Sequence, residues 1–386
     1  MKFLRSFLDK HRPAFEKGGR LQSLHSLFAG IEAFLYVPDR VTRSGCAIRD
    51  AVDLKRTMSV VVVALLPALL FGMYNVGYQH HLATGGGGDF WSMFLHGFAR
   101  VLPLIIVSYA VGLGIEFAAA QLRGHEINEG FLVTGLLIPM VMPVTAPLWM
   151  VGLSTAFAVI IGKEIFGGTG MNIWNPALLA RAFFFFSYPS RMSGDKVWVD
   201  GLPDGMSVAT PLAEASQGEA FAHDLGTMFW GLVPGSVGET SAFCILLGAA
   251  LLLVTGVGSW KIMTAVAIGG AGMALLLQQA LPETNPYSQV TVARHLLSGG
   301  FAFGAIFMAT DPVTAAQTSA GKWVYGLLVG VMAILIRALN PGYPEGMMLA
   351  ILLMNTFAPL IDWCVVQQNI RRRMKRGVSH VNRQPT

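Results

Sequence analysis

The chain has 386 residues, of which 53% are hydrophobic and only 13% are charged, whereas soluble domains contain about 25% charged residues. Of the 27 Lys and Arg residues, 11 precede Thr57 and six follow Ile370, so the net charge of +5 comes largely from the two ends. This pattern argues against a soluble domain. Because the basic residues form no stripe with interleaved aromatic residues, it also argues against a nucleic-acid partner. We therefore expect an all-α integral membrane protein with solvated tails.

Residues 1–57 are predicted to form a cytoplasmic N-terminal arm with one or two amphipathic helices. Apolar residues recur there at helical spacing: Leu21, Leu24, Leu27, Phe28, Ile31, Phe34 and Leu35. Such a stripe suits the membrane surface and a partner subunit equally well.

About ten apolar segments follow, and each can cross a hydrocarbon core, which needs roughly 20 residues. The predicted spans lie near residues 58–74, 96–119, 130–147, 148–166, 175–188, 240–257, 262–281, 295–311, 322–340 and 346–367. They divide the chain into a first membrane half (58–188), a periplasmic loop (189–226), a second membrane half (227–367) and a basic cytoplasmic tail (368–386).

An even number of spans places both termini on one side of the membrane. The basic arm and the run Arg371-Arg372-Arg373 indicate that this side is the cytoplasm. The predicted first outside loop, Asn75–Met93, contains no Lys or Arg. The loop 189–226 then lies outside, with six acidic residues against Arg191 and Lys196. The short inside turns contain basic residues: Arg123, Lys163, Lys261 and Lys322.

A duplication within the membrane part is suggested by two similar patterns. Gly167-Gly168 precedes Asn175-Pro176 after five spans, and Gly299-Gly300 precedes Asp311-Pro312 in the second half. Five-plus-five inverted repeats are common in transport folds. We therefore predict two inverted five-helix repeats.

The most informative short motif lies in the predicted outside loop. Residues 204–210 fit the pattern D-x-x-S-x-A-T, in which Asp204, Ser207, Ala209 and Thr210 are the fixed positions. This pattern resembles the acceptor sequence for covalent FMN, which a flavin transferase moves from FAD to the Thr hydroxyl as a phosphoester. Pro211 biases Thr210 toward an extended conformation. The alternative is a polar loop that matches the pattern by chance.

A second cluster combines glycines with asparagines in the stretch 167–177. Such a stretch breaks a helix at membrane depth, where free backbone is tolerated only beside protein or a cavity. The amides of Asn172 and Asn175 can hydrogen-bond a flavin ring or ligate a cation, and the alternative is a simple turn with Asn caps. Because so many glycines are a costly way to make a turn, we favour a functional role.

Ionisable residues inside spans form a third group. They are Glu116, Arg181, Asp311, Arg337 and Asp362. Intramembrane charges are costly and usually mark ion paths or buried pairs. Pro312 frees a backbone carbonyl next to Asp311, which suits a sodium shell. As a set they favour a translocation path, although any one of them could simply be a carboxylate at a helix end.

Residues that commonly ligate metals give no site in the sequence. Cys46, Cys244 and Cys364 form no Cys-x-x-Cys pair, so neither a metal site nor an iron–sulfur cluster is expected from this chain alone. His96 and His295 are lone intramembrane histidines, whereas a bis-histidine haem needs a facing pair. We expect packing or interfacial roles for them.

Longer blocks extend these motifs into a resemblance that covers the chain from end to end. The sequence resembles the family of B subunits of the sodium-translocating NADH:quinone reductase. The blocks that carry the resemblance are residues 49–56 (RDAVDLKR), 125–130 (HEINEG), 163–170 (KEIFGGTG), 204–210 (DGMSVAT), 307–312 (FMATDP) and 340–348 (NPGYPEGMM).

The resemblance implies a role that composition does not show. Members belong to a six-subunit complex of the bacterial inner membrane that passes electrons from NADH through flavins and iron–sulfur centres to ubiquinone and exports sodium. The single chain is not active alone. The resemblance implies covalent FMN on Thr210, non-covalent riboflavin, and part of the quinone site. NADH binds another chain of the complex, and no dinucleotide fingerprint after a strand occurs here.

Individual positions also match the family. Gly112, Leu113 and Glu116 fall on the segment linked to quinone-site inhibitors and cation uptake. Leu113 departs from the expected Gly-Gly pair, which puts inhibitor sensitivity in doubt. The resemblance assigns Asp311 and Asp362, together with Glu116, to sodium transfer. Without it, the glycines near Glu116 indicate either close helix packing or a slot for a flat quinone ring.

Three alternatives compete with this interpretation. The first is a D subunit of the Rnf ferredoxin:NAD oxidoreductase, which also carries FMN on Thr but has a shorter N-terminal arm. The second is a channel or transporter without redox chemistry, which has no use for the acceptor motif. The third is a structural anchor protein, which needs no intramembrane carboxylates. Bound flavin separates the quinone reductase and the Rnf alternative from the other two.

Overall fold

The computed structural model describes residues 2–15, 19, 21, 28, 32, 35–36, 54–123, 130–192, 197–203, 207–218, 221–282, 284–340 and 345–381. Every regular element in these ranges is a helix, and no strand occurs among them. The predicted all-helical class is therefore confirmed for this part of the chain. Most of the predicted apolar stripe of the N-terminal arm lies outside the described residues.

Among the described residues, the first part of the chain forms eight helical elements. They are α1 (Lys2–Phe15), α3 (Leu54–Thr84), α4 (Phe90–Arg123), α5 (Phe131–Met140), α6 (Leu148–Gly162), η2 (Glu164–Phe166), α7 (Pro176–Ser187) and α8 (Pro189–Met192). Two short helices, α9 (Pro211–Gln217) and α10 (Leu225–Trp230), lie in the loop between the halves. The second half contains α11 (Ala242–Val254), α12 (Trp260–Ala280), η3 (Pro286–Gln289), α13 (Val292–Leu297), α14 (Phe301–Phe303), η4 (Gly304–Met308), α15 (Ser319–Leu339) and α16 (Met347–Val381).

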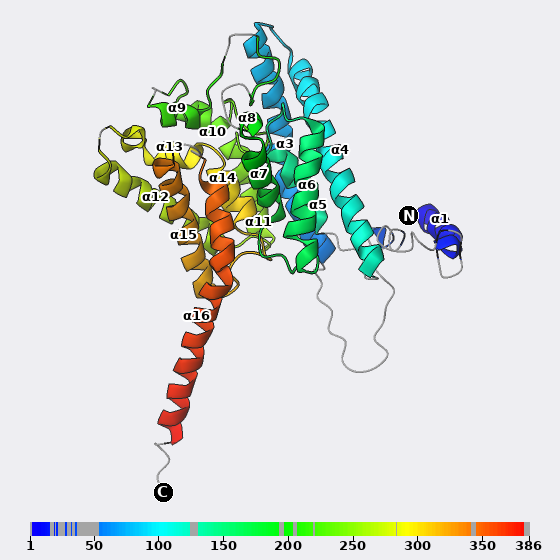
Figure 1. Ribbon diagram of the computed structural model, residues 1–386, viewed down its shortest axis with the longest axis vertical. Coiled ribbons are helices and arrows are strands. Elements are labelled where there is room, and N and C mark those ends of the chain that lie inside the picture. Colours follow the sequence, from blue (N-terminus) through cyan, green and yellow to red (C-terminus); the bar gives the residue numbers. More distant parts are fainter. Residues whose placement is uncertain are drawn as a thin grey trace.

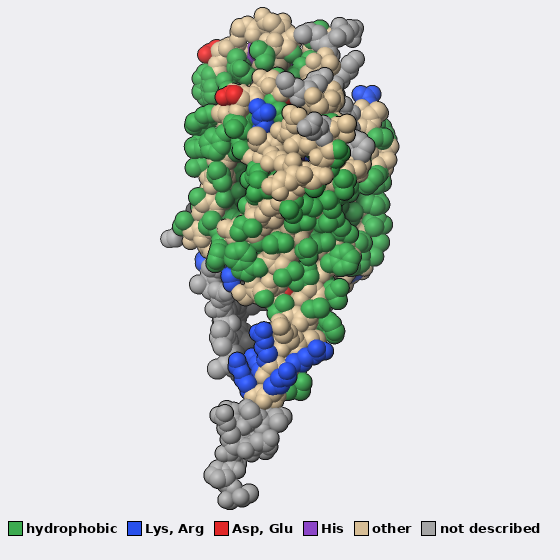
Figure 2. All heavy atoms as spheres, turned by 90° about the vertical axis from the view of Figure 1, so that its left-hand side faces the viewer, with side chains coloured by type: hydrophobic (Ala, Val, Ile, Leu, Met, Phe, Trp, Pro, Cys, Tyr) green, Lys and Arg blue, Asp and Glu red, His purple; other side chains and the backbone are tan. Residues whose placement is uncertain are grey.

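Six of the described helices are long and apolar enough to cross a membrane. They are α3, α4, α6 with η2, α12, α15 and α16, and the shorter apolar helices α5, α7 and α11 lie among them. Hydrophobic side chains form a broad belt around the middle of the molecule, and the Lys and Arg side chains of the α16 extension lie below it (Figure 2). A multi-pass membrane protein is thus supported, whereas the exact number of ten spans stays a prediction.

Three predicted boundaries were wrong. The segment 75–93 is largely helical, because α3 continues to Thr84 and α4 begins at Phe90. Asn75 is buried and donates a hydrogen bond to the Val233 carbonyl at 2.8 Å, so this polar residue lies inside the bundle rather than in a loop. The third span ends as a helix at Met140 and continues as irregular chain to residue 147. The eighth breaks at residues 298–300 and resumes as α14 and a π-helix, η4.

The helices pack in related ways in the two halves. In the first half α4 packs on α6 and α6 on α7, and in the second half α12 packs on α15 and α15 on α16. The halves meet where α3 contacts α11 and α7 contacts α16. A duplicated fold produces this kind of pattern, and the inverted repeat itself stays a prediction.

The bundle has two distinct ends (Figure 1). The loop end carries α9, α10 and α13, and the tail end is the one from which the C-terminal part of α16 projects. The N-terminal helix α1 lies toward the tail end as well. The first and the last described helices therefore both lie toward the tail end, while the predicted cytoplasmic location of the termini stays a prediction.

Candidate functional site

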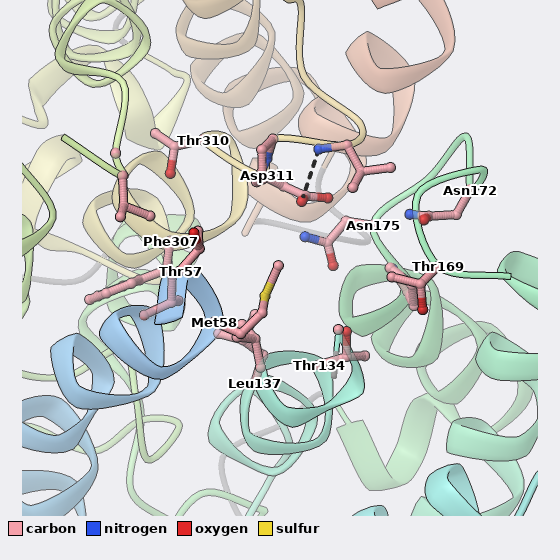
Figure 3. A pocket seen from close by; sticks show the side chains of 18 of the residues that line it. Thr57, Met58, Thr134, Leu137, Thr169, Asn172, Asn175, Phe307, Thr310 and Asp311 are labelled. Carbon is pink, nitrogen blue, oxygen red and sulfur yellow. Dashed lines mark hydrogen bonds between the residues drawn. The ribbon is translucent and has the colours of Figure 1, made fainter. Parts of the chain in front are cut away.

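A cavity of about 80 Å³ lies at the tail end, between the two halves of the bundle. Its walls come from the start of α3, from α5, from the 163–176 segment, from the end of α11 and from the chain after η4 (Figure 3). The polar side chains on these walls are Thr57, Thr134, Lys163, Thr169, Asn172, Asn175, Thr310 and Asp311. The volume corresponds to about two or three water molecules, so the cavity suits a small ion and its shell better than a large organic ligand.

Asp311 is the acidic residue of the cavity wall and is half-buried there. It lies where the chain leaves η4, in an irregular stretch that Pro312 keeps from continuing as helix. Its carboxylate accepts hydrogen bonds from the Thr314 hydroxyl at 2.8 Å and from the Val313 amide at 3.3 Å. These two donors fix the carboxylate at the cavity wall.

The glycine and asparagine stretch forms a second wall of the cavity. Gly167, Gly168 and Gly170 have φ values of 117°, 97° and 91°, which other residues rarely adopt, so the predicted interruption of the helix is confirmed. The Asn175 carboxamide oxygen caps α7 by accepting hydrogen bonds from the Ala177 and Leu178 amides at 3.0 and 3.5 Å. The Asn175 amide nitrogen points across the cavity toward Asp311 (Figure 3).

Lys163 is a cavity residue that the sequence identified only as a marker of the inner membrane side. Its side chain is 3% exposed and forms an ion pair with Glu116 of α4, which is 6% exposed. The ammonium also lies 5.8 Å from the centre of the Phe131 ring. The neighbouring pair, Arg123–Glu164 at 3.1 Å, has an arginine that is 42% exposed. The available sequence signal was the dipeptide Lys163-Glu164, which two residues separate from the glycine run.

The predicted quinone-site residues lie on α4 near this pair. Phe131 packs directly against Gly112, where an added Cβ would overlap its ring, whereas Gly114 faces open space. Leu113 is half-buried. Gly112 thus permits close packing of α4 and α5, and the quinone role of Gly112, Leu113 and Glu116 stays a prediction.

Asp362 lies on α16 and is not among the cavity-lining residues. Its carboxylate accepts hydrogen bonds from the Gln317 amide at 2.6 Å, the Thr318 amide at 2.9 Å and the Thr318 hydroxyl at 2.5 Å. It therefore ties α16 to the start of α15. Its predicted part in sodium transfer is not tested by this arrangement.

The predicted flavin acceptor lies at the opposite end of the molecule. Thr210 is half-buried and extended, with φ −77° and ψ 156°, as the following proline predicts. Its hydroxyl oxygen caps α9 by accepting a hydrogen bond from the Ala213 amide at 3.2 Å. Ser207 is exposed and Ala209 is half-buried, whereas Asp204 lies outside the described residues. The acceptor hydroxyl is thus near the surface, where another enzyme can reach it.

Two buried arginines hold the interior together. Arg181 bridges Glu239 and Glu345, at 2.5 Å each, and so joins α7 to the loop before α11 and to the start of α16. Arg337 donates hydrogen bonds to the carbonyls of His295 at 2.7 Å and Ser298 at 3.1 Å. Those carbonyls are freed where α13 breaks, so both arginines have structural roles.

The description of His96 as a lone histidine was wrong. Its ring stacks on that of His80 with centres 3.9 Å apart, and its Nε2 lies 3.1 Å from the Asp200 carboxylate. Arg100 also pairs with this carboxylate, at 2.7 Å. Asp200 thus holds the loop 197–203 against α3 and α4. This contact could not be predicted from the sequence, because the partners are far apart in the chain. His295 is buried and stacks on Tyr287, in agreement with the packing role.

Comparison with known proteins gives a consistent result. Residues 41–371 match the model of the NQR2, RnfD, RnfE family. A protein of Chromohalobacter salexigens, named as the B subunit of a Na(+)-translocating NADH-quinone reductase, is 46% identical over 98% of this chain and 97% of its own length. Proteins with the same name from Ectopseudomonas mendocina and Pseudomonas aeruginosa (strain LESB58) are each 45% identical over 97% of this chain, and the match spans 100% and 99% of their lengths.

Proposed function

The chain belongs to the NQR2, RnfD, RnfE family, and we propose that it acts as the B subunit of a sodium-translocating NADH–quinone reductase. In this role it is a multi-pass component of the bacterial inner membrane that carries electrons through flavins to ubiquinone and contributes to sodium export. The observation that carries the proposal is the match to named B subunits over nearly the whole chain. These relatives carry the reductase name, so the Rnf alternative is not favoured.

The loop end is proposed to carry covalent FMN on Thr210. The hydroxyl is half-buried and its backbone is extended. Its oxygen is the acceptor in the hydrogen bond from the Ala213 amide, so this bond does not engage the hydroxyl proton that the transfer reaction must remove. Bound FMN supplies one- and two-electron transfer. Ser207 is exposed and Ala209 is half-buried beside this hydroxyl, and a flavin transferase acts during maturation.

Riboflavin is proposed to lie against Asn172 from outside the cavity, while contact with the Asn175 amide, which points into the cavity (Figure 3), stays a prediction. A volume of about 80 Å³ is too small for a three-ring flavin, so the ring does not fit inside. Next to Asn172, however, Met171 and Ile173 are 68% and 38% exposed. Exposed apolar side chains of this kind suit a flat ring held against a partner protein. The ubiquinone role of Gly112, Leu113 and Glu116 belongs to the same end of the molecule.

Sodium is proposed to enter the cavity beside Asp311. Sodium is a hard cation that prefers oxygen ligands, and the cavity wall offers the Asp311 carboxylate together with the hydroxyls of Thr57, Thr134 and Thr310. The Thr310 hydroxyl donates to the Ile306 carbonyl at 2.5 Å, so its oxygen lone pairs can face a cation. The predicted roles of Glu116 and Asp362 in the same path remain part of this proposal.

The test uses the whole complex, expressed with its other subunits and a flavin transferase in membranes that lack endogenous reductase. With this chain, NADH oxidation by ubiquinone should be stimulated by sodium, and vesicles should accumulate sodium when NADH is added. Without it, both activities should be lost. Sodium-independent quinone reduction in the assembled complex would contradict the proposal.

A further inference from the structure

Lys163 differs from the other basic residues of the tail end because it is buried and faces a cavity. It follows the last residue of α6, and its ammonium lies between the Glu116 carboxylate and the Phe131 ring. A lysine that only marked the cytoplasmic side of the membrane would lie in water, as the half-exposed Arg123 does. Burying an ammonium is costly, so its position calls for a specific role.

The charges around the cavity do not balance. Lys163 and Asp311 line the same small cavity. One ammonium therefore serves two carboxylates, Glu116 and Asp311, and the ionised group has a net charge of 1 − 2 = −1. Because an uncompensated charge away from bulk water is unfavourable, one monovalent cation would complete the group.

We propose that Lys163 is a tethered cation that competes electrostatically with sodium for these carboxylates. The proposal rests on the sodium function proposed above and adds the residue that limits how tightly the ion is held. Sodium beside Asp311 is attracted by two carboxylates and repelled by one ammonium. The ammonium therefore keeps binding weak enough for the ion to leave again. A compact charge on a flexible four-carbon stem suits this role better than the planar fork of an arginine.

The net charge of the group then predicts the order of sodium affinity in a series of variants. Lys163→Gln leaves two carboxylates without an ammonium, for a net charge of −2, and should bind sodium more tightly than the wild type. Glu116→Gln leaves Lys163 to neutralise Asp311, for a net charge of 0, and should bind sodium more weakly. The double variant restores −1 and should resemble the wild type. The two single variants thus shift binding in opposite directions.

The experiment is a sodium titration of NADH–quinone turnover in the purified complex, at constant ionic strength maintained with choline. The half-saturating sodium concentration should fall about fivefold or more in Lys163→Gln and rise about fivefold or more in Glu116→Gln. Sodium-dependent protection against thermal unfolding provides a readout independent of turnover. Arg123→Gln is the matched control, because it breaks the adjacent Arg123–Glu164 pair outside the cavity, and it should shift the half-saturating concentration much less than Lys163→Gln because Arg123 is 42% exposed.

The proposal would be overturned if the half-saturating sodium concentration shifted equally in all variants. It would also be overturned if this concentration fell as much in the double variant as in Lys163→Gln. If Lys163→Gln does not assemble, Glu116→Gln and the double variant still test the order, since they differ only at residue 163. A wild-type complex without any sodium dependence would instead refute the proposed function. A sodium-dependent wild type whose variants do not follow the order refutes only the role of Lys163.

Discussion

The candidate functional residues at the loop end and at the tail end of the bundle differ in how exposed they are. At the loop end, Thr210 is half-buried, and the Asp200 carboxylate is shared by His96 and Arg100. At the tail end, Lys163 is 3% exposed and faces a cavity with Asp311. An acceptor of a covalent group must be reachable by a second enzyme, whereas an ion site needs partial removal from water. The difference indicates that the two ends have separate tasks.

The bridge that Arg181 forms with Glu239 and Glu345 stabilises the interior between the two ends, and its loss should have the largest effect on assembly. Arg181→Met removes the arginine from the carboxylates of Glu239 and Glu345, which are only 9% and 12% exposed, and this costs about 3–5 kcal/mol and should prevent assembly of the complex. Blue-native electrophoresis of membranes checks this. Arg100→Gln is the control, because that arginine is 54% exposed and such a pair contributes about 0–1 kcal/mol. Normal assembly of Arg181→Met would show that the interior bridge is dispensable.

Asp311→Asn should separate the two ends functionally. Removing the cavity carboxylate should raise the half-saturating sodium concentration about tenfold, which corresponds to about 1.4 kcal/mol. The content of covalent flavin should stay normal, because Thr210 caps α9, which lies at the opposite end of the bundle (Figure 1). A sodium titration and a flavin assay on the same preparation check both expectations. Unchanged sodium dependence, or loss of flavin, would break the assignment of separate tasks.

Variants of Asn175 should have a smaller effect, and they separate its role as a helix cap from its role in the cavity wall. Asn175→Ala removes the cap of α7 and should cost about 1 kcal/mol of stability. Asn175→Asp retains a capping oxygen but places a second carboxylate opposite Asp311, so it should alter sodium dependence more than thermal stability. Thermal unfolding of the two variants in the complex, alongside sodium titration, distinguishes the effects. Equal behaviour of both variants would mean that Asn175 is only a cap.

Much of the fold follows from hydrophobic pattern alone. Long uninterrupted spans such as 96–119 are confirmed within α4, because a membrane helix must satisfy its backbone internally. The interruption at residues 167–175 also follows from its glycines. The end of α5 at Met140 and the break before α14 were missed although Pro143 and Gly299-Gly300 lie there, because membrane helices tolerate such residues when other parts of the protein satisfy the freed backbone groups. Arg337, which hydrogen-bonds the freed carbonyls near Ser298, lies far from them in sequence.

The sites were predictable only where one short motif carries them. Thr210 and the asparagines of the 167–177 stretch could be found from local sequence. The partners Glu116 and Lys163 are 47 positions apart, and the partners His80 and Asp200 are 120 apart, so neither pairing leaves a local pattern. Only the fold reveals that Lys163 is buried and that His96 has a stacked neighbour.

The most direct test of the loop-end assignment is in-gel flavin fluorescence of this chain after denaturation, in complex expressed with its flavin transferase. The wild type should be compared with Thr210→Ala. Fluorescence in the wild type and its loss in Thr210→Ala is the predicted result. A wild-type chain without fluorescence despite an active transferase, or a Thr210→Ala chain that remains fluorescent, would contradict the assignment of the loop end as the site of covalent flavin.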